Sequence, residues 1–219
     1  MSADSDSAVS SPFRSAQGRS EDRAVKRQAL LTAAVQLFNE RGFHATSLDD
    51  VAARVGVTKP VVYHYLGNKD QVLFECVRFG LAQLREAAEA ARAQPGNGLD
   101  RLRAFLRSYT EVVMGDFGRC VIRTGEETLS AESRAQFRAS KREIDTAMRG
   151  MIEAAVADGS AEVADVRLTA FTIAGALSWS ARWYRDDIGP GAAATARDMV
   201  DILCAGLAPR SLDAREIGF

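Results

Sequence analysis

The sequence predicts an all-α protein of about nine helices. Apolar residues recur three and four positions apart along most of the chain, which places them on one face of a helix. Capping residues precede these stretches, and glycine or proline follows them. None of the stretches alternates between apolar and polar residues as a half-buried strand does. The chain of 219 residues, with 47% hydrophobic and 26% charged residues, can bury a sizeable core.

The first part of the chain contains four predicted helices. Residues 1–20 are rich in serine and lack apolar periodicity, so we expect a disordered leader there. Arg41 and Gly42 are typical of a helix end, and Ser47, Thr58 and Asn68 are suited to cap the next three helices. The predicted helices cover 21–41, 47–55, 58–66 and 68–93.

The rest of the chain contains further helical patterns, separated by breaks rich in glycine and proline. The main breaks are 95–98 and 189–191. The predicted helices cover 99–117, a short piece at 120–129, 131–158, 166–185 and 192–207. We therefore expect a three-helix domain at 21–67, a larger helical domain at 68–210, and a tail at 211–219.

Residues 46–66 form a predicted helix-turn-helix. Two short capped helices flank Gly56, the spacing at which the second helix of such a motif enters a major groove of DNA. In this second helix Val62, Tyr65 and Leu66 can pack inward. The residues left pointing outward are Lys59, Val61, Tyr63 and His64. Two short helices joined at a glycine also occur in many other helical proteins.

One residue string runs through this motif. It reads Thr46-Ser47-Leu48-Asp49-Asp50-Val51-Ala52, then Val55-Gly56-Val57-Thr58-Lys59, then Val62-Tyr63-His64-Tyr65-Leu66, and Lys69. This string resembles the N-terminal signature of the TetR/AcrR regulators, and the resemblance spans residues 22–75. One departure is Leu66-Gly67, where the family more often has an aromatic residue, and this affects packing more than contacts. The resemblance implies an operator-binding regulator that responds to a small molecule.

The resemblance also implies roles for individual residues. Side chains that contact phosphates position the domain on DNA, and side chains that face the groove read the base sequence. The expected phosphate contacts are Thr46, Tyr63 and Lys69. The expected groove-facing residues are Thr58, Lys59, Pro60, Val61 and His64. Ser47, which caps the helix before the turn, is included in the predicted DNA surface.

In this family the last two long helices build the dimer interface, and here they correspond to 166–185 and 192–207. Small residues around Gly175 would let helices approach closely, and Met199, Ile202 and Leu203 form an apolar stripe. An internal core explains the same stripe, but recognition of two DNA half-sites favours a homodimer.

The larger domain also contains candidate ligand-binding residues from several helices. Apolar side chains can line a cavity of the kind that small ligands use, although most such residues are ordinary core. The apolar candidates are Phe105, Tyr109, Met114, Phe117, Phe137, Phe171 and Trp179. Arg123 and Arg182 complete the predicted ligand-binding set.

Two stretches resemble the branch of the family that responds to acyl-CoA thioesters from lipid or steroid breakdown. They are 179–185 and the Glu126-Glu127 pair. Arginines at the mouth of an apolar pocket suit an acyl chain that ends in an anionic nucleotide. The candidates are Arg119, Arg123, Arg138 and Arg182. Solvated surface charge explains these arginines equally well, and the alternative is an efflux regulator that responds to a hydrophobic or cationic drug.

Several other classes of protein are disfavoured. The net charge of -1 means that any DNA contact must be local, and residues 14–27, with five basic and two acidic residues, carry such an excess. A solvated helix start explains that excess almost as well. The three cysteines form no CxxC pair, so we expect no metal and a reducing cytoplasm. We expect no membrane segment and no secretory signal, because no apolar stretch is long enough.

An enzyme is also disfavoured. Cys120 could be a nucleophile, but neither histidine lies in its predicted domain, and no Gly-rich phosphate loop suggests a cofactor. A purely architectural DNA binder would not need so large a helical C-terminal region. The predicted function is a repressor that binds a palindromic operator as a homodimer and is released by a small-molecule effector.

Overall fold

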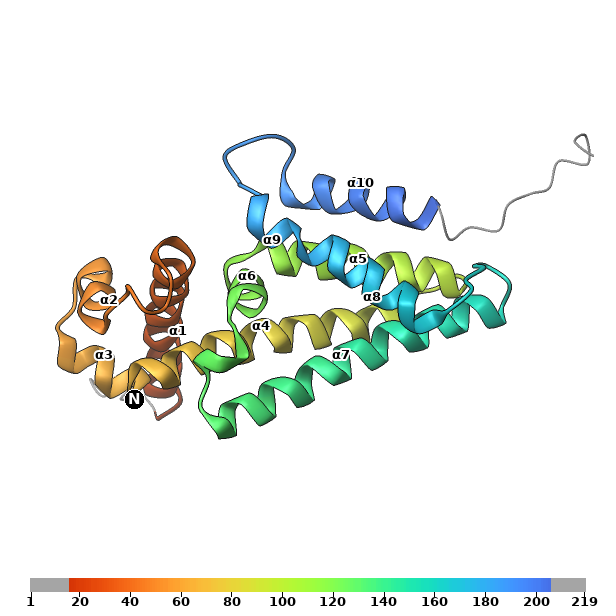
Figure 1. Ribbon diagram of the computed structural model, residues 1–219. Coiled ribbons are helices and arrows are strands. Elements are labelled where there is room, and N and C mark those ends of the chain that lie inside the picture. The colour runs from red at the N-terminus through yellow and green to blue at the C-terminus, as the bar shows by residue number, and fades with distance from the viewer. Residues whose placement is uncertain (1–15, 206–219) are drawn as a thin grey trace, which may run out of the picture.

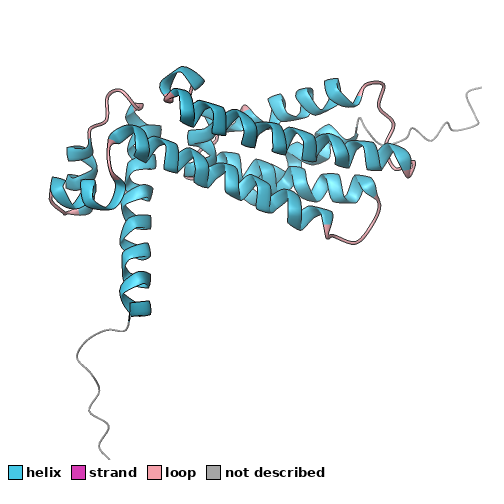
Figure 2. Ribbon diagram, turned by 90° about the horizontal axis from the view of Figure 1, so that it is seen from below, coloured by secondary structure: helices cyan, strands magenta, loops and turns pink. Residues whose placement is uncertain are grey.

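The computed structural model describes residues 16–205, and within that range it contains helices and no strand (Figures 1 and 2). The predicted all-α class is therefore confirmed. Of the predicted disordered leader at 1–20, residues 1–15 lie outside the described residues, as does the tail at 211–219, whereas residues 16–20 are helical and belong to α1. The elements are α1 (Ala16–Arg41), α2 (Leu48–Val55), α3 (Lys59–Leu66), α4 (Lys69–Arg92), α5 (Gly98–Met114), α6 (Asp116–Arg123), the 3-10 turn η1 (Glu126–Thr128), α7 (Ala131–Ala157), α8 (Val166–Ser178), α9 (Ser180–Trp183) and α10 (Ala192–Ala205).

The first three helices pack around one small core. α1 contacts both α2 and α3, and Val35, Val51 and Val62 are fully buried where they meet. Gly56 ends α2 with a φ of 72°, a left-handed conformation that glycine adopts without steric cost. The turn at this glycine sets α3 across α2, as a helix-turn-helix requires.

α1 begins at Ala16, before the predicted start at residue 21. Its first turns project away from the remainder of the molecule, as Figure 2 shows. Val25, in this projecting part, is 70% exposed. A helix that has no partner to pack against shows no apolar periodicity, so the sequence pattern could not locate its start.

The larger domain is a bundle in which α4 and α7 run side by side and α5 packs on both (Figure 1). α8 covers α5 and α7, and α10 packs mainly on α5. Leu102, Phe105 and Ile152 are fully buried between these helices. α4 also contacts α1 and α3, so this helix joins the two domains. No helix among the described residues is both long and apolar enough to cross a membrane.

Two predicted helices are each divided in the structure. The predicted helix at 99–117 breaks at Gly115, which has extended backbone angles, and α6 starts in a new direction at Asp116. The predicted helix at 166–185 turns at Trp179, and the Ser180 hydroxyl donates a hydrogen bond of 2.7 Å to the Leu177 carbonyl at this point. A serine that bonds to the backbone competes with regular helix, which explains the break.

α6 lies against α4 with its backbone almost in contact. A Cβ atom at Gly80 of α4 would lie only 2.6 Å from the carbonyl oxygen of Phe117 in α6. The rings of Phe79 and Phe117 lie beside this point with centroids 4.5 Å apart. Only glycine allows this approach, because any side chain at residue 80 would overlap the α6 backbone.

Candidate nucleic-acid interface and ligand cavity

The outward face of α3 carries the residues predicted to face a DNA groove. Val62 and Leu66 are buried and Tyr65 packs against the same core, which confirms the predicted inward face. Val61 is half-buried at the edge. The exposed residues at and along this helix are Thr58, Lys59, Pro60, Tyr63 and His64. The structure therefore brings these five side chains to one open surface.

Lys59 is paired with a carboxylate on the preceding helix. Its Nζ donates to Asp49 Oδ2 over 2.9 Å and lies 5.9 Å from the centre of the Tyr63 ring. The hydrogen bond to Asp49 raises the pKa of Lys59. Both side chains of the pair are more than half exposed. Sequence reasoning missed Asp49 as a site residue, because its partner Lys59 lies on the next helix, across the turn.

Lys69 lies in the first turn of α4, half-buried beside the loop that follows α1. Its Nζ donates to the His44 carbonyl over 3.4 Å and lies 4.3 Å above the ring of Phe43. The ring and the carbonyl hold the ammonium group close to α3, since α4 follows that helix directly. Lys69 thus remains near the predicted DNA surface, at its edge.

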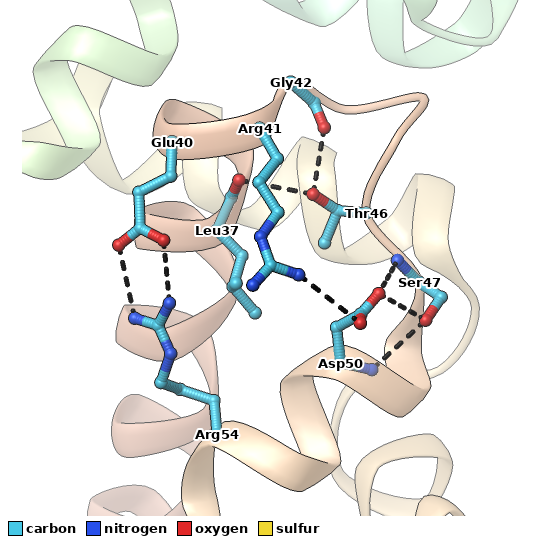
Figure 3. Close-up of polar contacts among 8 residues, drawn as sticks. All are labelled: Leu37, Glu40, Arg41, Gly42, Thr46, Ser47, Asp50 and Arg54. Carbon is cyan, nitrogen blue, oxygen red and sulfur yellow. Dashed lines mark hydrogen bonds and ion pairs between the residues drawn. The ribbon is translucent and has the colours of Figure 1, made fainter.

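Thr46 has a different position from the one predicted. Its side chain is only 2% exposed, and its hydroxyl donates to the carbonyls of Leu37 at 3.2 Å and Gly42 at 2.9 Å (Figure 3). The expected phosphate contact by this side chain is corrected, because the hydroxyl is committed to the end of α1. Thr46 instead fixes the loop that leads into α2.

Ser47 caps α2, as predicted. Its Oγ accepts a hydrogen bond of 3.1 Å from the Asp50 amide, and the Asp50 carboxylate accepts one of 2.7 Å from the Ser47 amide (Figure 3). The Arg54 guanidinium of α2 donates two hydrogen bonds, of 3.3 and 2.7 Å, to the Glu40 carboxylate of α1. The hydrogen bond with Arg54 lowers the pKa of Glu40. These contacts fix the direction of the helix that precedes α3.

A second candidate site is a partly open cavity of about 430 Å³ lined by residues of α4, α5, α6, α7 and α8. Its wall is mainly apolar, with Leu84, Val121 and Met148 on three different helices. Lys141 and Asp145 of α7 are its charged residues. The other lining residues are Leu81, Tyr109, Ile122, Thr124, Ile144, Phe171, Ala174, Gly175 and Ser178. An apolar wall with a few polar groups is typical of a small-molecule site.

Two hydroxyl groups meet at the wall of this cavity. The Tyr109 hydroxyl and Ser178 Oγ lie 2.8 Å apart, so one of them donates to the other. Burial raises the pKa of Tyr109, which keeps the phenol protonated. The pair joins α5 to α8 and is the polar part of a wall that is otherwise apolar on these two helices.

The cavity includes only Tyr109 and Phe171 of the nine predicted ligand-binding residues. The other predicted apolar residues do not line this cavity, because helical periodicity identifies a buried face but not whether it borders a space. Phe105, Met114, Phe117 and Phe137 are core residues with at most 9% exposure. Trp179 is 62% exposed on the outside, and Arg182 lies over its ring at 5.7 Å.

None of the predicted arginines lines this cavity. Arg123 donates from Nη1 to the Asn39 carbonyl of α1 over 3.0 Å. Arg119 donates from Nη2 to the Met114 carbonyl over 2.8 Å. Arg138 differs from both, since it forms an ion pair of 2.6 Å with Glu126. No local pattern could reveal the bond between Arg123 and Asn39 of α1, because the two residues lie far apart in the chain.

The cysteines have no feature of a catalytic or metal site. Cys120 is 3% exposed, and burial raises the pKa of its thiol to about 11, far from the range of a reactive thiolate. Cys76 and Cys204 are also fully buried. Among residues 16–205 no group of three histidine, cysteine or acidic side chains could hold a metal ion.

α8 and α10 present large apolar side chains to the outside. Leu168 and Phe171 on α8 are 65% and 50% exposed, and Ile202 on α10 is 75% exposed. Trp179 and Trp183 lie exposed at the end of the same region. The exposure of such large apolar side chains to water does not stabilise a monomer, so this surface is suited to contact another protein surface.

In a comparison with known proteins, both domains match models of the same family. A family model described as tetracyclin repressor-like, C-terminal domain, matches residues 95–207, and one described as bacterial regulatory proteins, tetR family, matches residues 30–76. The chain is 30% identical over 197 residues to the HTH-type transcriptional repressor KstR2 of Rhodococcus jostii (strain RHA1), a match that covers 85% of this chain and 93% of that protein.

Two further similarities differ in extent. The HTH-type transcriptional regulator BetI of Rhizobium meliloti (strain 1021) is 32% identical over 83 residues, and the match spans only 41% of that protein. The crystal structure of AibR in complex with isovaleryl coenzyme A and operator DNA has a TM-score of 0.71 and 26% identity, and covers 81% of this chain and 97% of that chain. From these matches the chain belongs to the TetR family of transcriptional regulators, which is not a family of enzymes.

Proposed function

We propose that the protein is a cytoplasmic repressor that binds a palindromic operator through α3. The observation that carries this proposal is the exposed row of Lys59, Tyr63 and His64 on a helix whose other face is buried. α3 sits at the end of the molecule, away from the bundle, where a major groove could receive it (Figure 1). Lys69 and Tyr63 would contact phosphates, while Thr58, Lys59, Pro60, Val61 and His64 would face the bases, with Ser47 at the edge.

The exposed apolar surface of α8 and α10 supports a homodimer. Two copies related by a two-fold axis would cover Leu168 and Ile202 with the same residues of the partner. The two α3 helices would then reach half-sites about one turn of DNA apart, roughly 34 Å, or a multiple of that distance. A dimer of this kind explains why an operator read by one short helix can be specific.

The cavity supports a small-molecule effector, and we assign it to the acyl group of an acyl-CoA thioester. Its apolar wall suits a hydrocarbon chain, and the Tyr109 and Ser178 hydroxyls could bond to an oxygen of the acyl group. AibR, to which the chain is similar, binds isovaleryl coenzyme A and operator DNA. The alternative effector is a hydrophobic cation of the kind that efflux regulators bind, which Asp145 in the cavity wall would favour.

Through linkage, the effector would lower the affinity for the operator, and the operator would lower the affinity for the effector. If the effector binds better when the two α3 helices are misaligned, it lowers operator affinity by the factor by which the operator lowers effector affinity. α4 would transmit the change, because Leu81 and Leu84 line the cavity while its first turn holds Lys69 beside α3. A small shift of α4 would change the distance between the two reading helices.

A footprint on the DNA that flanks the protein's own gene tests the proposal. We expect protection of a palindrome, lost on addition of octanoyl-CoA or isovaleryl-CoA. Release by a lipophilic cation such as ethidium, without any response to the thioesters, would replace the proposed effector by the alternative. No protection at any palindrome, with a correctly folded protein, would contradict operator binding by α3.

A further inference from the structure

Three arginines lie close together where α6 meets α9. Arg119 and Arg123 lie one turn apart on α6, and Arg182 lies on α9, which packs against α6. Arg119 also donates from Nη2 to the Tyr184 carbonyl over 3.3 Å, which ties α6 to the end of α9. Within the described part of the chain, none of the three forms an ion pair with a carboxylate. We call these residues the arginine cluster.

The charges of the arginine cluster act on one another. Partial burial lowers the pKa of Arg123, and the positive charges of Arg119 and Arg182 lower it further. The Nε of Arg119 is buried and lacks a hydrogen-bond partner among the described residues. Uncompensated like charges favour an anion between them, and guanidinium groups match the geometry of phosphate oxygens.

Two members of the cluster are close in the chain to residues of the cavity, and one of them contacts α1. Arg123 lies between Ile122 and Thr124, which line the cavity, and Arg182 follows the cavity residue Ser178 by about one turn. On its other side, Arg123 bonds to the carbonyl of Asn39 over 3.0 Å. Asn39 belongs to the last turn of α1, whose carbonyl oxygens lack donors within the helix. A cation at this position stabilises the helix end.

We infer that the arginine cluster binds the phosphate groups of the effector, and that Arg123 changes partner when they bind. This inference rests on the proposed acyl-CoA effector. A phosphate oxygen is a stronger acceptor for a guanidinium than a neutral carbonyl, so Arg123 leaves Asn39 for the phosphate. The last turn of α1 then loses its bond to the end of α6.

The remaining contacts between the two helices set how α1 responds. Gln36 donates to the Asp116 carboxylate over 3.1 Å, and the Asn39 side chain donates to the Asp116 carbonyl over 2.8 Å. Both bonds lie at the first turn of α6, away from Arg123, and stay in place. α1 therefore pivots about Asp116 and carries α2 and α3 with it, which changes the alignment of the reading helix.

The variants Arg182→Ala and Arg123→Ala form a matched pair for the test. Each removes one positive charge from the cluster, but only Arg123→Ala removes the bond to α1. Calorimetry measures binding of octanoyl-CoA, S-octanoyl-pantetheine, which has no phosphate, and ADP alone. Fluorescence anisotropy measures operator affinity with and without saturating ligand, and circular dichroism confirms that both variants are folded.

We expect the wild type to bind octanoyl-CoA at least about tenfold more tightly than S-octanoyl-pantetheine, and both variants to lose most of this preference. Octanoyl-CoA should lower operator affinity of the wild type and of Arg182→Ala by a factor of about 5–150, the usual range of such coupling. In Arg123→Ala this factor should be clearly smaller than in Arg182→Ala, because the connection from ligand to α1 is gone and only the path through α4 remains.

The outcomes separate this inference from the proposed effector. Unchanged preference in both variants would overturn the phosphate site, and equal loss of coupling in both would overturn the role of Arg123. If ADP alone acts on the wild type as octanoyl-CoA does, the switch is supported, but the effector is a free nucleotide. If neither octanoyl compound nor ADP binds, the inference fails together with the acyl-CoA proposal.

Discussion

Lys59 Nζ lies 2.9 Å from the carboxylate of Asp49, so the reading helix carries a lysine whose charge is already paired within the protein. DNA must compete with this carboxylate for the ammonium group, and the carboxylate itself repels phosphates. The pair is exposed, so it contributes little to folding and acts mainly on DNA affinity.

Replacement of Asp49 should therefore strengthen DNA binding. We expect Asp49→Asn to raise affinity for both operator and unrelated DNA, because the freed Lys59 adds about one phosphate contact and steepens the salt dependence by about one unit of slope. Lys59→Ala should do the opposite. Anisotropy titrations across a range of salt concentrations measure both slopes, and parallel slopes in the two variants would contradict this role for the pair.

Tyr63 and Lys69 should contribute to affinity without contributing to sequence preference. Tyr63→Phe and Lys69→Ala each remove one predicted phosphate contact, so operator affinity should fall by roughly 5- to 10-fold for each, with helicity unchanged. Arg142→Ala, on the exposed side of α7, is the control and should bind as the wild type does. Mobility-shift titrations that show wild-type affinity in both variants would remove these two residues from the interface.

Thr46 should act on stability and not on DNA. Thr46→Val keeps the shape of the side chain but leaves the carbonyls of Leu37 and Gly42 without its hydroxyl, so the free energy of unfolding should fall by about 1–2 kcal/mol. Urea denaturation measures this loss. If operator affinity falls while stability is unchanged, the hydroxyl contacts phosphate after all, and the buried position is not the one that binds DNA.

Glu75 should make folding sensitive to acid. Partial burial raises its pKa, but hydrogen bonds from Arg78 and from Arg27 of α1 outweigh burial and hold the pKa below its ordinary value. The resulting stability is fully present above the ordinary glutamate pKa of about 4.3 and is lost as the pH falls through the lowered pKa of the folded state.

Glu75→Gln should therefore be less stable than the wild type at neutral pH and should lose less stability between about pH 5 and pH 3. Urea denaturation at several pH values checks this. Glu153→Gln, an exposed residue of α7, is the control and should follow the wild-type curve. A variant curve parallel to the wild type at every pH would mean that Glu75 does not stabilise the folded state by its charge.

The exposed apolar surface of α8 and α10 predicts the behaviour of two variants in solution. Leu168→Asp and Ile202→Asp should each raise the dimer dissociation constant at least about 100-fold, because each change occurs twice in a two-fold interface and places a charge in an apolar contact. Val25→Asp changes an equally exposed residue of α1 and should leave the dimer intact. Sedimentation analysis distinguishes these cases, and dimers in all three would place the interface elsewhere.

The DNA-binding part could be predicted nearly residue by residue. Caps, the glycine at residue 56 and apolar spacing fixed α2 and α3, and these local rules also placed Lys59 and Tyr63 outward. Thr46 was misplaced because its hydroxyl bonds to carbonyls of α1, a contact that local pattern does not reveal. Asp49 was missed for the same reason, since its partner lies across the turn.

The cavity in the larger domain could be predicted much less well. A helical stripe shows that Phe105 and Phe137 are buried, yet burial against another helix and burial against a cavity give the same pattern. The cavity depends on how five helices meet, and that depends on breaks at Gly115 and Trp179 which the periodicity did not show. The bond from Arg123 to Asn39 depends on the same tertiary arrangement.

The missing side chain at Gly80 has a mechanical consequence. Because α4 and α6 are in close backbone contact at this residue, a shift of one helix toward the other would produce a steric clash, so we expect the two to move together. A displacement that starts at the cavity side of α6 should therefore move α4 with it at Gly80, which lies about three turns of helix from the start of α4.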